Sequence, residues 1–189
     1  MITGIPGVGK SSIINGFVKE NESFNILEYG NIIQEFIFKK YNINERNRIG
    51  DYATSKDVSD CDKMFLERIC EETFRDLIIE AHGIVKLDFG YKYEPFRGIK
   101  KASIDGIVMI EASPKRLIQY RLNHDDKKRK VENFREIELH QGLLRNEVMT
   151  YVSYLEIPGY FMLNNSNLRS CIKNLNKIIR EIKRGKSER

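Results

Sequence analysis

Residues 4–11 read Gly-Ile-Pro-Gly-Val-Gly-Lys-Ser, which is a glycine, four residues and then Gly-Lys-Ser. This spacing is typical of a phosphate-binding loop, whose backbone N–H groups and following helix N-terminus face the anion. In such a loop Lys10 reaches the outer phosphates, and the Ser11 hydroxyl is one oxygen ligand of Mg²⁺. The motif predicts that a nucleoside triphosphate binds here, through Gly4, Pro6, Gly7, Val8, Gly9, Lys10, Ser11 and Ser12.

Basic residues in the second half of the chain form a second chemical signal. Phosphoryl transfer depends on cations around the moving group more than on bond-making side chains. Arg121 precedes a charged segment, about 123–134, and Arg145 lies on the helix that follows it. We expect this segment to be a short basic lid over the phosphates, although a solvated run of charges remains the alternative. The candidate catalytic cations are Lys10, Arg121, Lys127, Arg129 and Arg145.

Apolar patterning predicts strands that alternate with helices along residues 1–189. Strands are expected at 1–3, 24–29, 84–88, 104–111 and 159–163, and helices at 10–19, 31–41, 59–81, 114–122, 133–155 and 168–184. Polar pairs that would cap helices are Asn31 with Gln34, Ser59 with Asp62, and Asn133 with Glu136. This order is typical of a single three-layer α/β/α domain of the P-loop NTPase fold, with a parallel five-stranded sheet whose first strand is very short.

Composition limits the class of protein. The chain has 189 residues, of which 41% are hydrophobic and 31% charged, as in an ordinary globular domain. Apolar runs are too short to cross a membrane, so the cytoplasm is the expected location. Three cysteines without a paired spacing favour neither a disulfide framework nor a zinc site. A net charge of +5 suits polyanionic ligands, and both nucleotides and nucleic acid qualify.

The chain resembles the archaeal-type adenylate kinases, a family of P-loop nucleoside monophosphate kinases. Three segments carry the resemblance: residues 3–10, the strand, cap and helix from Ile110 to Leu122, and the stretch from Glu138 to Arg145 with Tyr151 beyond it. It covers residues 3–30 and 105–164. The resemblance implies ATP and AMP as substrates, Mg²⁺ as cofactor, a cytoplasmic enzyme and often a trimer.

The resemblance also implies roles for residues of an acceptor region at about 31–81 and beside it. Gly30 would let the acceptor nucleotide approach the backbone, and Arg46 and Arg97 are candidates for its phosphate. The family places Asp-Thr-His at the end of its third strand, where this chain is expected to have Lys86-Leu87-Asp88, so Asp88 would orient water on Mg²⁺. In the lid, the family's Arg-x-Arg-Asp becomes Lys127 to Lys130, which retains one arginine.

Two other functions remain open from the sequence. One is a P-loop ATPase that acts as an RNA-linked or ribosome-linked assembly factor, for which the basic residues 183–189 would serve. The other is an inactive nucleotide-binding paralogue, which the altered lid and the short first strand would suit. RNA therefore stays a possible partner beside the nucleotides, and a membrane partner is not expected.

Overall fold

The computed structural model describes residues 1–43, 49–71, 76–81, 83–87, 89–93, 96, 98–123 and 132–187, without the side chains of 50, 51 and 123. Five parallel strands form one sheet in the order β2-β3-β1-β6-β7. They are β1 (Ile2–Thr3), β2 (Phe24–Glu28), β3 (Asp76–Glu80), β6 (Ile107–Glu111) and β7 (Gly159–Leu163). β1 lies at the centre, where Ile2 pairs with Glu80 on one side and with Val108 on the other.

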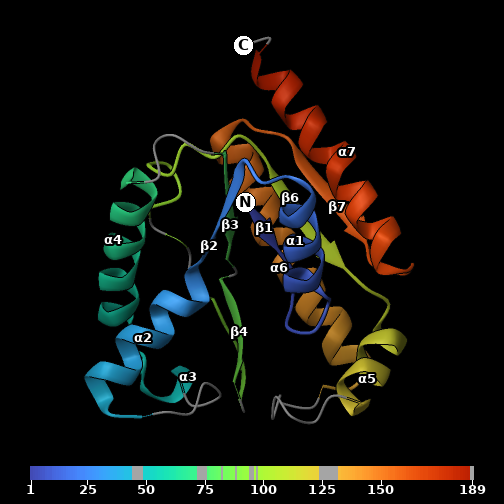
Figure 1. Ribbon diagram of the computed structural model, residues 1–189. Coiled ribbons are helices and arrows are strands. Elements are labelled where there is room, and N and C mark those ends of the chain that lie inside the picture. The colour runs from blue at the N-terminus through green and yellow to red at the C-terminus, as the bar shows by residue number, and fades with distance from the viewer. Residues whose placement is uncertain are drawn as a thin grey trace.

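Helices cover both faces of this sheet (Figure 1). α1 (Lys10–Glu20) and α7 (Leu168–Ser187) pack together on one face, and α6 (Phe134–Leu155) crosses the other. α2 (Tyr29–Tyr41), α3 (Ile49–Tyr52) and α4 (Ser55–Glu71) lie together at the β2 side, and α5 (Pro114–Asn123) follows β6. The core between these layers contains the fully buried Ile13, Phe17, Phe65, Met109, Leu117 and Ile137. The predicted three-layer fold with five parallel strands and a short first strand is confirmed.

The predicted third strand is wrong. Residues Ile84–Leu87 form β4, which pairs antiparallel with β5 (Gly90–Tyr93) in a separate two-stranded sheet. The third parallel strand is β3, which falls inside the helix predicted for 59–81. Leu77 and Ile78 continue the helical spacing of that helix, but Leu77-Ile78-Ile79 is also a continuous apolar run of the kind found in buried strands. Pairing along the whole of β2 decides between the two patterns.

Of the three predicted capping pairs, one is confirmed and two are wrong. The Asn133 cap is confirmed, because its side chain accepts from the Glu136 N–H and Glu136 reaches back to the Asn133 N–H. The other two caps are wrong. α2 begins at Tyr29, directly after β2, so Asn31 lies inside its first turn. α4 begins at Ser55, where Thr54 and Asp57 form the reciprocal cap instead of Ser59 and Asp62.

Among the described residues, no helix is long and apolar enough to cross a membrane. The helix with the clearest amphipathic pattern, α7, buries Cys171, Ile172 and Leu175 against the body of the protein.

A buried carboxyl group lies between α6 and the sheet. Glu147 is 7% exposed and lines a small cavity with Thr3, Gly83 and Tyr151. Burial raises the pKa of Glu147 to about 7, although hydrogen bonds from the Tyr151 hydroxyl and the Gly83 N–H oppose the shift. The group therefore changes charge near neutral pH, inside the core.

Because Glu147 holds its proton more tightly in the folded chain than in the unfolded chain, its contribution to stability is complete below pH 4.5 and is lost as pH rises through about 7. Glu147→Gln has no group to titrate there, so it should lack this decrease, on the order of 3 kcal/mol, in the free energy of unfolding. The measurement is the free energy of unfolding by urea at about pH 5 and about pH 8. The exposed Glu138 provides the control Glu138→Gln, which should keep the wild-type pH dependence. An unchanged pH dependence in Glu147→Gln would contradict the assignment.

Candidate active site

The phosphate loop connects β1 to α1 and depends on glycine at its ends. Gly4 has φ +152°, and a Cβ built on it would lie 2.4 Å from the Ile110 carbonyl oxygen of β6. Gly9 has φ +89° and would meet the Asn164 amide at 2.6 Å. Gly4 therefore leaves no space for a side chain, and at Gly9 the positive φ favours glycine and a side chain would displace the Asn164 amide. Gly9 also precedes the first turn of α1, so the N-terminus of that helix opens into the loop.

Three side chains from different elements hold the loop through its carbonyl groups. Lys10 of α1 donates to the Gly4 oxygen at 2.7 Å. Arg121 of α5 donates to the Pro6 oxygen at 2.8 Å, and Asn164, just after β7, donates to the Val8 oxygen at 2.6 Å. Alternate carbonyls of the loop are thus bonded to the surrounding protein. This pattern suits a loop whose N–H groups face a phosphate.

A carboxylate stands beside the lysine and the serine of the motif. Glu80 ends β3, and its oxygens lie 3.8 Å from the Lys10 Nζ and 3.5 Å from the Ser11 Oγ, which donates to it. Lys10 is 7% exposed, so its charge is held inside the site by this contact and the Gly4 carbonyl. Sequence reasoning assigned the strand-end carboxylate to Asp88, which lies outside the described residues. The third parallel strand of the sheet ends instead at Glu80.

Arg121 connects the phosphate loop to a buried polar cluster. Its Nη1 donates to Glu132 at 2.7 Å, and its Nε is buried without a hydrogen-bond partner among the described residues. Glu132, in turn, lies 3.0 Å from the Nδ1 of His140 and accepts from the Tyr91 hydroxyl at 3.2 Å. Burial favours a raised pKa for Glu132, but the bonds from His140 and Arg121 outweigh it and lower the pKa. An ionised Glu132 therefore fixes Arg121 against the loop.

Arg145, on α6, lies beside the carboxyl end of β6. Its Nε and Nη2 donate to one oxygen of Glu111, the last residue of β6, at 3.1 and 2.6 Å. The arginine is 51% exposed, whereas Glu111 is buried. The N–H of Ala112, the next residue, donates to the Gln141 side chain at 3.1 Å. Arg145 thus lies at the carboxyl edge of the sheet with its guanidinium open to solvent.

The predicted site residues have three different outcomes. The structure brings together the loop residues, including Gly7 and Ser12, with Lys10 and Arg121, and it places Arg145 at the same edge of the sheet. Gly30 lies in the first turn of α2. The remaining candidates lie outside the described residues: Arg46, Asp88, Arg97, Lys127 and Arg129.

Sequence reasoning missed four residues that contact this site: Glu80, Glu111, Glu132 and Asn164. Glu80, Glu111 and Asn164 share a detectable signal, since each is a polar residue at or just after the carboxyl end of a parallel strand, where ligands bind in such sheets. Glu132 offers no such signal. Its role depends on the side chains of Arg121 and His140, which only the folded chain brings together.

Comparisons with known proteins agree with this geometry. The family model described as an AAA domain matches residues 3–138. An adenylate kinase of Pyrobaculum aerophilum is 32% identical over 75% of this chain and 72% of its own length. An adenylate kinase of Methanothermobacter thermautotrophicus is 24% identical over 95% of this chain and 97% of its own length.

Among solved structures, the shikimate kinase of Bacteroides thetaiotaomicron is similar in fold. It has a TM-score of 0.52 and 12% sequence identity, with 95% of this chain and 96% of that chain covered. At this identity the likeness concerns the fold alone. The curated relatives and the family model, together with the loop and its carboxylate, show more: this chain belongs to the adenylate kinase family.

Proposed function

We propose that this protein transfers the γ-phosphoryl group of Mg-ATP to AMP. The observation that carries the proposal is the phosphate loop, with Lys10 buried between the loop and Glu80 and with Arg121 bonded to both the loop and Glu132. Family membership supports the nature of the reaction, since several relatives of this chain are named adenylate kinases.

On the donor side, the loop N–H groups and the α1 N-terminus would bind the phosphates of ATP. Lys10 would exchange its bond to the Gly4 carbonyl for a phosphate oxygen. Arg121 has a buried Nε–H without a partner among the described residues and lies against the loop, so a phosphate oxygen would satisfy that donor. Lys127, Arg129 and Arg145 would complete the cations around the moving group.

The residues beside the loop fit a magnesium ion. The Ser11 hydroxyl and the Glu80 carboxylate supply oxygens, which Mg²⁺ prefers. Among the described residues no group of three or more His, Cys, Asp or Glu side chains is placed to hold a metal, which suits an ion that retains water and substrate phosphates. Bound there, Mg²⁺ would neutralise charge on the phosphates. We propose Glu80 for the role that Asp88 was expected to have.

On the acceptor side, AMP requires no general base. Its phosphate has a pKa near 6 for the second proton, so an ionised oxygen is present at neutral pH. That oxygen would form a bond to the γ-phosphorus while the bond to the bridging oxygen of ATP breaks, giving two molecules of ADP. Gly30, Arg46 and Arg97 are the proposed acceptor contacts. An assembly of three copies, which the resemblance implies, stays a prediction.

The reaction is tested by measuring ADP formed from Mg-ATP with AMP, CMP, GMP or UMP as acceptor. We expect ADP to form in quantity only with AMP. Lys10→Ala should lower the turnover number by about 10²-fold to 10³-fold, because it removes a cation placed for the transition state. Lys19→Ala, on the outer end of α1, is the control and should retain full turnover. ADP formed without any acceptor would favour an ATPase. If no ADP forms with any of the acceptors, the protein would be an inactive paralogue.

Glu80→Gln tests the proposed metal contact. The substitution preserves size but removes the charge and replaces one accepting oxygen by an NH₂ group, so the Mg²⁺ concentration that gives half-maximal turnover should rise by about tenfold or more. The measurement is turnover against free Mg²⁺ at saturating nucleotides. Glu28→Gln, a strand-end carboxylate of β2, gives a matched control with an unchanged requirement. A wild-type Mg²⁺ dependence in Glu80→Gln would contradict the assignment.

A double-mutant cycle tests whether Glu132 acts through Arg121. Glu132→Gln should lower the turnover number by about tenfold to a hundredfold, with a smaller change in KM for ATP, because a misplaced cation costs transition-state stabilisation. In an Arg121→Ala background the same change should have less than about a twofold effect. Glu136→Gln, which alters the partner of Lys86 one turn further along, is the control. Additive losses in the cycle would show a general structural role instead.

A further inference from the structure

The positive charge of the chain is concentrated on one helix. α7 contains seven of the 32 Lys and Arg residues but only one of the 27 Asp and Glu residues. The helix therefore has a net charge of +6, and the rest of the chain, at a total of +5, has a net charge of −1. The basic character of this protein is a property of α7 rather than of its nucleotide site.

Five of these cations form a single line along the outside of the helix. They recur at helical spacing, all are exposed, and they lie opposite the face that buries Cys171 and Leu175. Over 15 residues the line is about 22 Å long. We name it the basic stripe: Arg169, Lys173, Lys177, Arg180 and Arg184.

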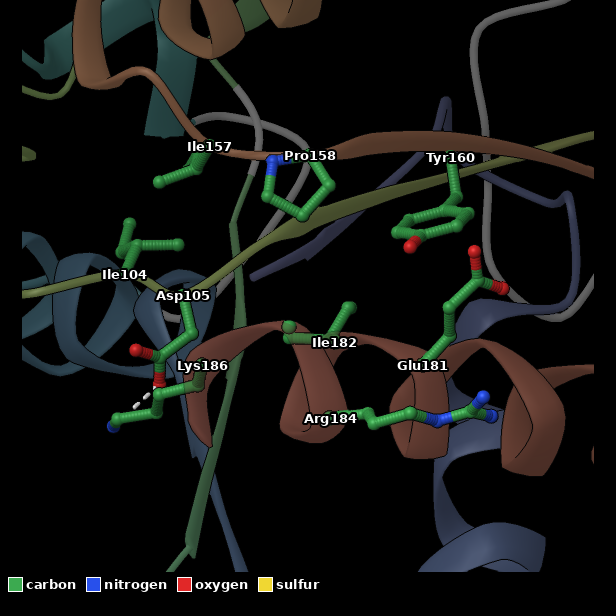
Figure 2. Close-up of a pocket in the computed structure, with 10 residues that line it drawn as sticks. Ile104, Asp105, Ile157, Pro158, Tyr160, Glu181, Ile182, Arg184 and Lys186 are labelled. Atoms are coloured by element: carbon green, nitrogen blue, oxygen red, sulfur yellow. Dashed lines mark hydrogen bonds and ion pairs between the residues drawn. The ribbon is translucent and has the colours of Figure 1, made fainter. Parts of the chain in front are cut away.

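The carboxylates near α7 pair with cations outside the basic stripe. Lys183 pairs with Asp76 and Lys186 with Asp105, both outside the basic stripe. Figure 2 shows the C-terminal end of α7, where a cavity of about 450 Å³ lies between the helix and the starts of β6 and β7, and Arg184, the last cation of the stripe, borders it. There the one acid of α7, Glu181, points toward Tyr160. Within the part of the chain that the structure describes, no ion pair joins a stripe cation to a carboxylate.

The stripe matches a row of phosphates. Its cations follow one another at about 4.5–6 Å along the helix axis, and a nucleic-acid strand carries a phosphate about every 3.4 Å of its axis, so each cation can lie near a phosphate. A basic line along one helix face is the electrostatic pattern of nucleic-acid binding. A lipid surface is less suitable, because membrane-binding helices insert an apolar face, and the apolar face of α7 is buried in the protein.

The side chains around the stripe favour a duplex RNA backbone. Proteins that bind single strands usually stack bases on aromatic rings, and α7 has no aromatic residue. Asn174, which is exposed beside the stripe, has the donor and acceptor groups that a 2′-hydroxyl can bond. We propose that the basic stripe of α7 binds the phosphate backbone of double-stranded RNA, independently of the phosphotransfer reaction.

The test is the fluorescence anisotropy of a labelled RNA duplex, titrated with the full chain in saturating Mg-ATP so that the nucleotide site is occupied. Five phosphate contacts predict a slope of about −4.5 for log K against log salt between 50 and 200 mM, and a Kd within about 10⁻⁶–10⁻⁴ M. The triple variant Lys173→Gln, Lys177→Gln and Arg180→Gln should reduce the slope by about 2.7 and weaken binding at least tenfold.

A matched triple variant controls for total charge. Lys56→Gln, Lys63→Gln and Lys101→Gln remove three exposed cations outside α7 and should leave the Kd within twofold. Wild-type turnover and thermal midpoint in the α7 variant would show that the helix still folds. Equal losses in both variants, or an unchanged slope in the α7 variant, would overturn the proposal.

The partner is tested in the same assay. A DNA duplex of the same sequence should bind at least twofold more weakly, and phosphatidylserine vesicles should not displace the RNA. Equal or tighter binding of DNA would overturn the choice of RNA, and displacement by vesicles would assign the stripe to an anionic lipid surface.

Discussion

The arrangement of the phosphate loop is the constraint on which the rest of the site depends. β1 has two residues, so the strand alone gives the loop little support. The support comes instead from side chains that bind the carbonyls of residues 4, 6 and 8, and from Gly4, which packs directly on the β6 backbone. Within the loop the Val8 N–H donates to the Ile5 carbonyl at 3.4 Å, and the outward bonds of the other carbonyls leave neighbouring N–H groups to face an anion. A short strand is thus compatible with a rigid loop.

Two of the side chains that hold the loop also bring positive charge to it. Lys10 and Arg121 each bind a loop carbonyl and a buried or half-buried carboxylate, Glu80 and Glu132. A buried cation needs such a partner, since removal from water is costly without one. Each carboxylate holds its cation at the loop in the structure seen here. The same two contacts would set how readily each cation transfers to a phosphate oxygen.

The sequence predicted the fold class, the loop and most elements, because these depend on local patterns. The Gly-Lys-Ser motif, the apolar run of β6 and the cap at Asn133 each lie within a few residues. Two of the predicted caps were local errors. The errors that affect the site depend on distant pairing. Leu77-Ile78-Ile79 suits a helix or a strand until β2 pairs with it, and that error moved the strand-end carboxylate from Glu80 to Asp88. Glu132 was missed because its partners meet it only in three dimensions.

The bond between Asn164 and Val8 has a consequence for how the site assembles. It joins residues 156 positions apart, and β1 lies between β3 and β6, which both follow it in the chain. Contacts of such long range form slowly, because a large loop must close before they stabilise anything. During synthesis the loop is made well before the segment that completes it. We expect the phosphate-binding loop to be among the last parts to become ordered, so a nascent or truncated chain that lacks β7 would contain the motif without a formed site.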